Sequence, residues 1–339
     1  MTGDTKDMAS NTAQSRTRGL RTWLSTWSAR WIRERSRRRW GDFAIIVVIV
    51  ILMVITATVS DVFLTQRNLS NLLRQIVTNG LISLGMLVVI LTGGIDLSVG
   101  PTVAMTGILA AGLLEYMPLV PAVLVALVVG VLIGLINGSL IASFKLQPFI
   151  VTLATMGAIR GAIYVYSETP KTPVDSTFRE YLGGAFIGPI PVAAIIMLVA
   201  FPLVWVFLNR TTAGRAMVAI GGNEEAVRLA GINVRRHILM AYVISGLFSA
   251  IAGVLLASRL GIAQPSVGAG YELDAIAACV IGGAILGGGG GGAVGTFGGV
   301  LALGLIDNLL NLFNVQSYYQ QIFKGIIILL AVLARRREK

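Results

Sequence analysis

The sequence predicts an all-α polytopic membrane protein with about ten transmembrane helices, and three observations support this fold class. Apolar residues make up 55% of the 339 residues and charged residues only 13%, whereas soluble domains are about one quarter charged. Apolar stretches long enough to cross a bilayer recur along the chain. Basic residues gather at the chain ends and in one loop, as expected of segments that face the cytoplasm. The net charge of +11 therefore indicates a membrane surface rather than a nucleic acid as partner.

Residues 1–42 form a predicted cytoplasmic tail that is basic and rich in tryptophan. Its apolar side chains recur at helical spacing, at Leu20, Trp23, Leu24, Trp27, Trp31 and Ile32. This pattern is typical of a helix lying on an anionic membrane face, and the alternative is a disordered basic tail. The basic part is too long for a cleavable signal peptide. The arginines at 37–39 place the N-terminus in the cytoplasm.

Residues 43–334 form the predicted transmembrane domain. A span needs about 20 apolar residues, and the predicted spans are 43–60, 71–92, 98–115, 119–143, 148–166, 191–208, 238–258, 273–288, 293–313 and 317–334. An even number of spans returns the chain to the cytoplasm, and the basic C-terminal segment 335–339 agrees. The same count places the arginine-rich loop 209–236 inside and the charge-balanced loop 167–190 outside.

Glycine marks a packing ridge and two breaks in the predicted helices. Gly130, Gly134 and Gly138 lie four residues apart, a spacing that lets another helix approach closely. The stretches 91–100 and 282–292 interrupt apolar helices with glycine. Non-helical backbone at membrane depth is tolerated only where protein or a cavity covers it, and such breaks often mark a transport path. The span count puts both breaks on the same side of the membrane, whereas an inverted repeat would place them on opposite sides.

A short polar helix is predicted within 221–234. Asn223 is the expected N-cap, Glu224 and Glu225 suit the positive end of a helix, and Gly231 suits its C-terminal end. A helix of about two turns is marginal alone in water. We therefore expect a partner to hold it. The residues predicted to dock that partner are Gly222, Asn223, Glu224, Glu225, Ala226, Leu229 and Gly231. The alternative is a capped helix in a cytoplasmic loop without a partner.

Polar groups inside the predicted spans are candidates for a substrate pathway, because they are costly in lipid. The candidates are Asp96, Asn137, Thr152, Thr155, Asp307, Asn308 and Asn311. Amides and carboxylates suit hydroxyl-rich ligands, which need both donors and acceptors. Each candidate also has a structural alternative: an N-cap for Asp96, helix–helix bonding for the asparagines and Asp307, and bonding to their own backbone for the threonines. We also hypothesise an ion pair between Lys324 and Asp307, and expect Arg160 to extend toward the outer surface.

The sequence contains none of the enzyme motifs considered, neither a Walker phosphate loop nor a metal-ligand spacing. One cysteine, Cys279, lies in an apolar run, and one histidine, His237, lies at a membrane edge. No cofactor is expected in this chain. Uphill transport would take its energy from an ion gradient or from a partner that hydrolyses ATP.

Five stretches resemble the membrane permease subunits of bacterial sugar ATP-binding-cassette (ABC) importers, in particular the ribose, xylose and galactose branch. They are LTGGIDLSVG at 91–100, QPFIVTLATM at 147–156, AIGGNEEAVRLAGINV at 219–234, AQPSVGAGYELDAIAACVIGG at 263–283 and SYYQQIFKGIIILLAVL at 317–333. The resemblance covers about residues 45–334. The tail 1–42 is longer than is usual in that family, and the all-glycine run 287–292 lacks the family's usual charged residue.

The resemblance implies a type II importer architecture of ten spans in the bacterial plasma membrane. It implies a homodimer or a heterodimer with a related permease, two cytoplasmic ATPase subunits and an extracytoplasmic sugar-binding protein. The helix in 221–234 would be the coupling helix that docks on the ATPase. Two alternatives make different predictions: an ion-coupled secondary transporter would work without the ATPase, and a membrane scaffold or receptor would show no flux.

Overall fold

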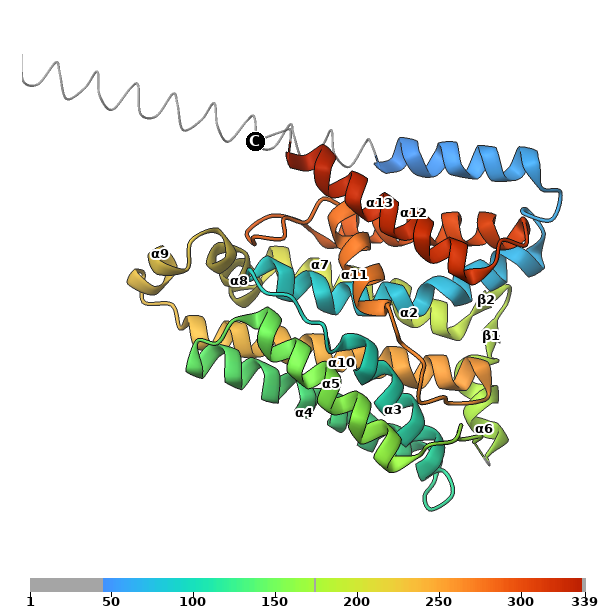
Figure 1. Cartoon of the computed structure of the whole chain (residues 1–339), viewed down its shortest axis with the longest axis horizontal. Helices are drawn as coiled ribbons and strands as arrows, with labels where there is room; N and C mark the ends of the chain where they lie inside the picture. Colours follow the sequence, from blue (N-terminus) through green and yellow to red (C-terminus); the bar gives the residue numbers. More distant parts are fainter. Residues whose placement is uncertain (1–44, 174, 337–339) are drawn as a thin grey trace, which may run out of the picture. The chain divides into compact units, whose positions relative to one another are not determined.

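A computed structural model describes residues 45–173 and 175–336 (Figure 1). The predicted surface helix and the rest of the tail 1–42 lie outside the described residues, as do residues 337–339. The helical stretches begin with Ile45–Val59, α2 (Gln66–Leu91), α3 (Val99–Leu113), α4 (Leu119–Phe144) and α5 (Pro148–Tyr166). A short connection then contains α6 (Ser176–Phe178), the π-helical turn η1 (Arg179–Gly183) and the antiparallel strands β1 (Phe186–Ile187) and β2 (Ile190–Pro191).

The second part of the chain is also helical. It contains α7 (Val192–Arg210), α8 (Thr212–Gly222), α9 (Glu224–Leu229), α10 (Val234–Leu260), α11 (Tyr271–Ile281), α12 (Ala293–Leu312) and α13 (Ser317–Arg336). Within the described ranges, six helices are long and apolar enough to cross a membrane: α2, α4, α5, α7, α10 and α12. Ile45–Val59 and α3 are apolar but shorter. The all-α, multi-span fold class is confirmed at this level.

Several predicted spans coincide closely with observed helices. The predicted span 148–166 has the same ends as α5, and 293–313 ends one residue after α12. The predicted span 273–288 is wrong in its second half, because α11 ends at Ile281. The backbone from Gly282 onward turns through several glycines with positive φ before α12 starts. The apolar pattern continues there, but the glycines do not support a helix.

Helices α2 and α10 lie at the centre of the packing. α2 is buried almost continuously from Ile76 to Leu91, and α10 packs against α2, α3 and α4. The predicted glycine ridge on α4 faces α10. A Cβ atom on Gly134 would overlap the carbonyl oxygen of Tyr242 and would lie 2.9 Å from its carbonyl carbon, so the two helices approach more closely than side chains would allow. The prediction of a close helix–helix contact is therefore confirmed.

The two kinds of connecting segment lie at opposite ends of the long helices (Figure 1). Helices α8 and α9 extend from one end, and α6 with the β1–β2 hairpin lies at the other. Apolar side chains on the outer faces of the long helices are exposed, including Leu124, Ile136 and Leu203. Such surfaces suit contact with lipid tails.

Candidate functional site

Helix α9 has the predicted caps at both ends. The Asn223 side chain accepts a hydrogen bond from the backbone N–H of Ala226 at 2.9 Å. Glu225 and Arg228 form two side-chain hydrogen bonds, at 2.6 and 3.0 Å. Gly231 follows with a φ of 79°, in the left-handed region that glycine adopts without strain. The local sequence thus defines a helix of six residues with satisfied ends.

One side of α9 is buried against the rest of the protein, and the other side is exposed. Val227 is buried against Ile220 and Val234. The other residues of α9, all of them described, are exposed, and Leu229 is 79% exposed. The sequence reasoning named Leu229 for docking but missed Val227 as the anchor. The signal was present, because Val227 follows the cap at a spacing that places it opposite Glu225 and Leu229.

The connection that carries α9 contains more helix than the sequence reasoning expected. Helix α8 begins at Thr212, with the Thr211 side chain accepting from the N–H of Gly214 at 3.0 Å. Gly222, predicted as part of the docking segment, is the last residue of α8. The backbone N–H of Asn223 also bonds to the carbonyl of Ala219 at 3.0 Å, so α9 is joined directly to the end of α8.

The exposed ion pair on α9 persists at physiological pH. The hydrogen bonds from Arg228 lower the pKa of Glu225 below its ordinary value. A lowered folded-state pKa contributes stability that is present above the ordinary pKa and is lost as the pH falls through the lower one. The pair is therefore intact throughout the neutral range, and it contributes little because both side chains are exposed.

Four predicted pathway residues meet in one buried polar cluster at the break between α2 and α3. One Asp96 carboxylate oxygen accepts from the Ser98 hydroxyl at 2.6 Å, and the other accepts from Ser245 at 2.8 Å. Asn137 donates to the Ser98 hydroxyl at 2.9 Å and accepts from Thr155 at 2.7 Å. This "Asp96 cluster" comprises Asp96, Ser98, Asn137, Thr152, Thr155, Tyr242 and Ser245.

The Asp96 cluster holds the non-helical segment in place. Thr152 donates to the carbonyl of Ile95 at 3.2 Å, and Tyr242 donates to the same carbonyl at 3.4 Å. Backbone groups that the break leaves free are thus bonded from α5 and α10, as a dry interior requires. Ser98 is the residue before the first turn of α3 and makes no side-chain cap bond, whereas the Asp96 carboxylate accepts from the backbone N–H of Ser98 at 3.0 Å, the kind of bond expected of an N-cap. Ser245 and Tyr242 were missed, although each is a polar group within the apolar sequence of α10.

A second polar cluster joins α11, α12 and α13. Lys324 lies 3.0 Å from a carboxylate oxygen of Asp307 and 3.0 Å from one of Asp274. The hypothesised pairing of Lys324 with Asp307 is therefore present, and Asp274 is a third member that the sequence reasoning missed. No spacing along the chain relates Asp274 to the other two, because the three lie on different helices.

The remaining predicted pathway residues on α12 bond to other helices. Asn308 and Asn68 of α2 exchange two side-chain hydrogen bonds, at 3.0 and 3.2 Å. Asn311 accepts from Gln320 of α13 at 2.9 Å. Asp307, Asn308 and Asn311 thus bond to residues of α2 and α13, and none of the hydrogen bonds or ion pairs of these three described residues goes to the Asp96 cluster.

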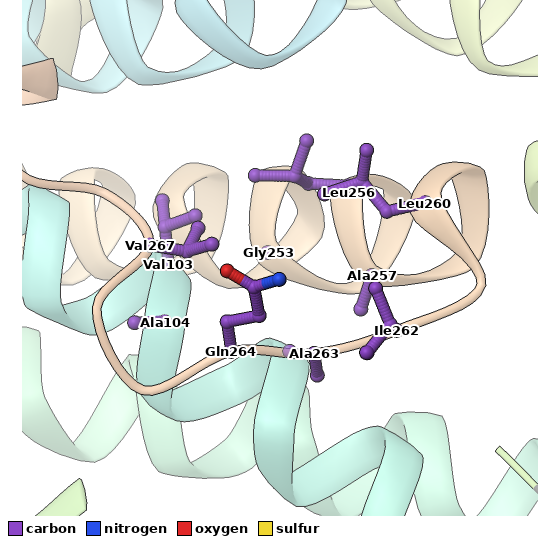
Figure 2. A pocket seen from close by; sticks show the side chains of 11 residues that line it. Val103, Ala104, Gly253, Leu256, Ala257, Leu260, Ile262, Ala263, Gln264 and Val267 are labelled. Atoms are coloured by element: carbon purple, nitrogen blue, oxygen red, sulfur yellow. The ribbon is translucent and has the colours of Figure 1, made fainter. Parts of the chain in front are cut away.

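The loop 261–270 covers a small pocket beside α3 and α10 (Figure 2). Gln264 lies over Gly253 and Val103 there. The pocket has room for about one water molecule, so it is too small for a monosaccharide. Arg160 donates to the carbonyls of Pro265 and Val267 in this loop. The expectation that Arg160 extends toward the outer surface stays a prediction; its guanidinium reaches the loop that follows the end of α10 and binds these backbone oxygens.

A multi-span helical protein with buried polar clusters and a capped helix extending from one end has the arrangement of a membrane transport subunit. Comparison with known proteins agrees. A family described as "Branched-chain amino acid transport system / permease component" matches residues 68–332. The ribose import permease protein RbsC of Bacillus subtilis is 48% identical over 85% of this chain and 90% of its own length.

Two further relatives come from Escherichia coli. Its ribose import permease protein RbsC is 44% identical over 87% of this chain and 93% of its own length. Its galactose/methyl galactoside import permease protein MglC is 38% identical over 85% of this chain and 92% of its own length. No solved structure matches the chain. The chain belongs to this permease family, in the branch that contains the sugar permeases of bacterial ABC importers. It is a transport subunit and not an enzyme, and the ATPase is a separate subunit.

Proposed function

We propose that this permease moves a monosaccharide of the ribose type into the cytoplasm of a bacterium by alternating access. The relatives named for ribose import are 41–48% identical to this chain over most of its length, whereas the relative named for galactose import is 38% identical. This difference supports ribose as the substrate. The working complex would contain two permease chains, two ATPase subunits and an extracytoplasmic sugar-binding protein. The chain would cross the plasma (inner) membrane about ten times, as a type II importer, with both termini in the cytoplasm.

The observation that carries the docking proposal is the construction of α9. Its caps and its Val227 anchor fix the position of six residues, while Leu229 and the neighbouring alanines stay exposed. An exposed apolar side chain on a well-fixed helix suits insertion into a groove of a partner. Gly222, Asn223, Glu224, Glu225, Ala226, Leu229 and Gly231 form the proposed contact with the ATPase.

We place the gate of the sugar path at the Asp96 cluster. In the described conformation Asp96, Asn137 and Thr152 are buried, and their hydrogen bonds go to other members of the cluster or to backbone. Sugar hydroxyls, which both donate and accept, could replace these bonds when the helices separate. Asp307, Asn308 and Asn311 would supply a second polar region along α12. Thr155→Val should lower sugar uptake while leaving ATPase binding unchanged, and normal uptake would rule out this gate.

The complex is tested in nanodiscs with the ATPase subunit and the ribose-loaded binding protein of the same importer. We expect the wild-type chain to bind the ATPase, and the loaded binding protein to stimulate ATP hydrolysis. Leu229→Asp should abolish binding to the ATPase, since it places a charge in the apolar contact. Tyr116→Asp is the matched control, because Tyr116 is also 79% exposed and lies in the turn before α4, away from α9.

Three results would contradict the proposal in different ways. A chain that neither binds the ATPase nor changes its turnover is not the permease of that complex. Ribose uptake that proceeds without the ATPase and collapses with an uncoupler would indicate an ion-coupled transporter. Equal ATPase binding by Leu229→Asp and Tyr116→Asp would exclude α9 as the docking element.

A further inference from the structure

Three segments that are far apart in the sequence meet at backbone contacts made by glycine. They are the first helix break after Leu91, the end of α8 at Gly221, and the second break at Gly288 and Gly289. The backbone N–H of Gly289 donates to the carbonyl of Leu91 at 3.1 Å. We call Gly93, Gly221, Gly288 and Gly289 the glycine junction.

The segments approach too closely for any side chain. A Cβ atom on Gly221 would lie 2.8 Å from the Cα of Gly288 and would overlap the carbonyl oxygen of Leu91 and the nitrogen of Gly289. A Cβ atom on Gly288 would lie 2.6 Å from the Cα of Gly221 and 2.9 Å from the nitrogen of Gly93. Gly288 and Gly289 also have φ values of 91° and 73°, which disfavour other residues.

The junction is joined along the chain to α9 and to the segments that lead to both polar clusters. Gly221 is the penultimate residue of α8, two residues before the Asn223 cap of α9. The first break continues from Gly93 to Asp96, at the centre of the Asp96 cluster. The second break leads into α12, which carries Asp307 and Asn308. Backbone alone therefore connects α9 to the Asp96 cluster through the first break, and to the start of α12 through the second.

Backbone contact is a stiff connection. Side chains between two segments can change rotamer and absorb a small movement, whereas directly packed backbone has no such freedom. We propose that the glycine junction transmits the movement of α9 to the two helix breaks, so that ATPase closure rearranges both polar clusters together. This role explains the glycines at 288 and 289, and it rests on the proposed function, because it takes α9 as the ATPase docking element.

The test compares two alanine substitutions in the complete complex. Gly221→Ala adds one methyl group at the junction. Gly287→Ala adds the same group in the neighbouring glycine run, where a Cβ would meet no atom within 4 Å. We expect Gly221→Ala to bind the ATPase and to keep basal ATP hydrolysis. Ribose uptake and stimulation by the ribose-loaded binding protein should fall about tenfold, within the usual range of coupling between distant sites. Gly287→Ala should match the wild type.

A second measurement on the wild type keeps the inference testable if Gly221→Ala does not fold. Hydrogen exchange is compared between the nucleotide-free complex and the complex trapped with ATP and vanadate. Exchange should change at both breaks, 92–97 and 284–291, whenever it changes at α9. The proposed role of the junction would be overturned if Gly221→Ala took up ribose as well as the wild type does. It would also be overturned if hydrogen exchange changed at α9 but not at the two breaks. A wild-type chain that does not bind the ATPase would instead refute the proposed function.

Discussion

Asn223 controls the position of α9 through one side chain. Its amide oxygen satisfies the N–H of Ala226, and its backbone N–H bonds back to Ala219 of α8. A helix of six residues has few internal hydrogen bonds of its own, so its caps matter more than in a long helix. Whether α9 stays folded in this position therefore depends on Asn223 as well as on the buried side chain of Val227.

Asn223→Ala should weaken binding of the ATPase without changing the rest of the fold. Losing an N-cap costs about 1 kcal/mol, which corresponds to several-fold weaker binding if α9 must be ordered to dock. Asn223→Asp is the control, because aspartate caps equally well. Titration of the ATPase subunit against nanodiscs measures both. Equal affinities for the alanine and aspartate variants would show that the cap does not matter for docking.

Helices α11, α12 and α13 are joined by an ionic contact of three members. Lys324 of α13 lies within ion-pair distance of both Asp274 of α11 and Asp307 of α12. All three side chains are at most 20% exposed, so little solvent screens them. One lysine thereby holds the last described helix against two neighbours, and its removal leaves two carboxylates facing each other.

Lys324→Met should destabilise the protein more than Asp307→Asn does. Removing the shared cation strands two buried carboxylates and costs about 3 kcal/mol, whereas Asp307→Asn leaves the Asp274–Lys324 pair intact. Exchanging Asp307 and Lys324 should restore stability only partly, because a carboxylate at 324 would face Asp274. Adding Asp274→Asn should complete the rescue. Thermal unfolding in detergent measures the series, and full rescue by the simple exchange would exclude a role for Asp274.

At the scale of the whole molecule, the two ends of the helices carry different segments. Helices α8 and α9 lie at one end, and the hairpin β1–β2 at the other (Figure 1). Both helix breaks meet α8 at the glycine junction, so they lie at the same end. This agrees with the span count, which placed both breaks on one side, and it does not support an inverted placement of the two.

Labelling of engineered cysteines tests this orientation. Leu229→Cys and Tyr116→Cys place thiols at equally exposed positions near opposite ends. The natural Cys279 is buried, so background labelling should be low. A membrane-impermeant maleimide should label Tyr116→Cys in intact spheroplasts and label Leu229→Cys only after permeabilisation. The reverse pattern would place α9 outside and exclude its contact with a cytoplasmic ATPase.

The sequence by itself determined most helices and the construction of α9. Apolar length and glycine placement are local properties, so they predicted α5, the first break and the α4 ridge closely. The caps of α9 were readable because each depends on residues only a few positions apart. Apolar length alone failed for 273–288, whereas the glycine break predicted at 282–292 is confirmed, because α11 ends at Ile281 and α12 begins at Ala293.

Only the tertiary structure decided which distant groups meet. The Asp96 cluster draws on four segments, and Lys324 reaches two helices, so neither arrangement follows from local spacing. Asp274 joined its cluster without any signal in its neighbouring residues, and the only local signal for Ser245 was a polar group within an apolar helix. Gly288 and Gly289, within the glycine run, have a role only because Gly221 packs against them. Contacts between distant segments depend on how whole helices pack, and the packing is set by the entire chain.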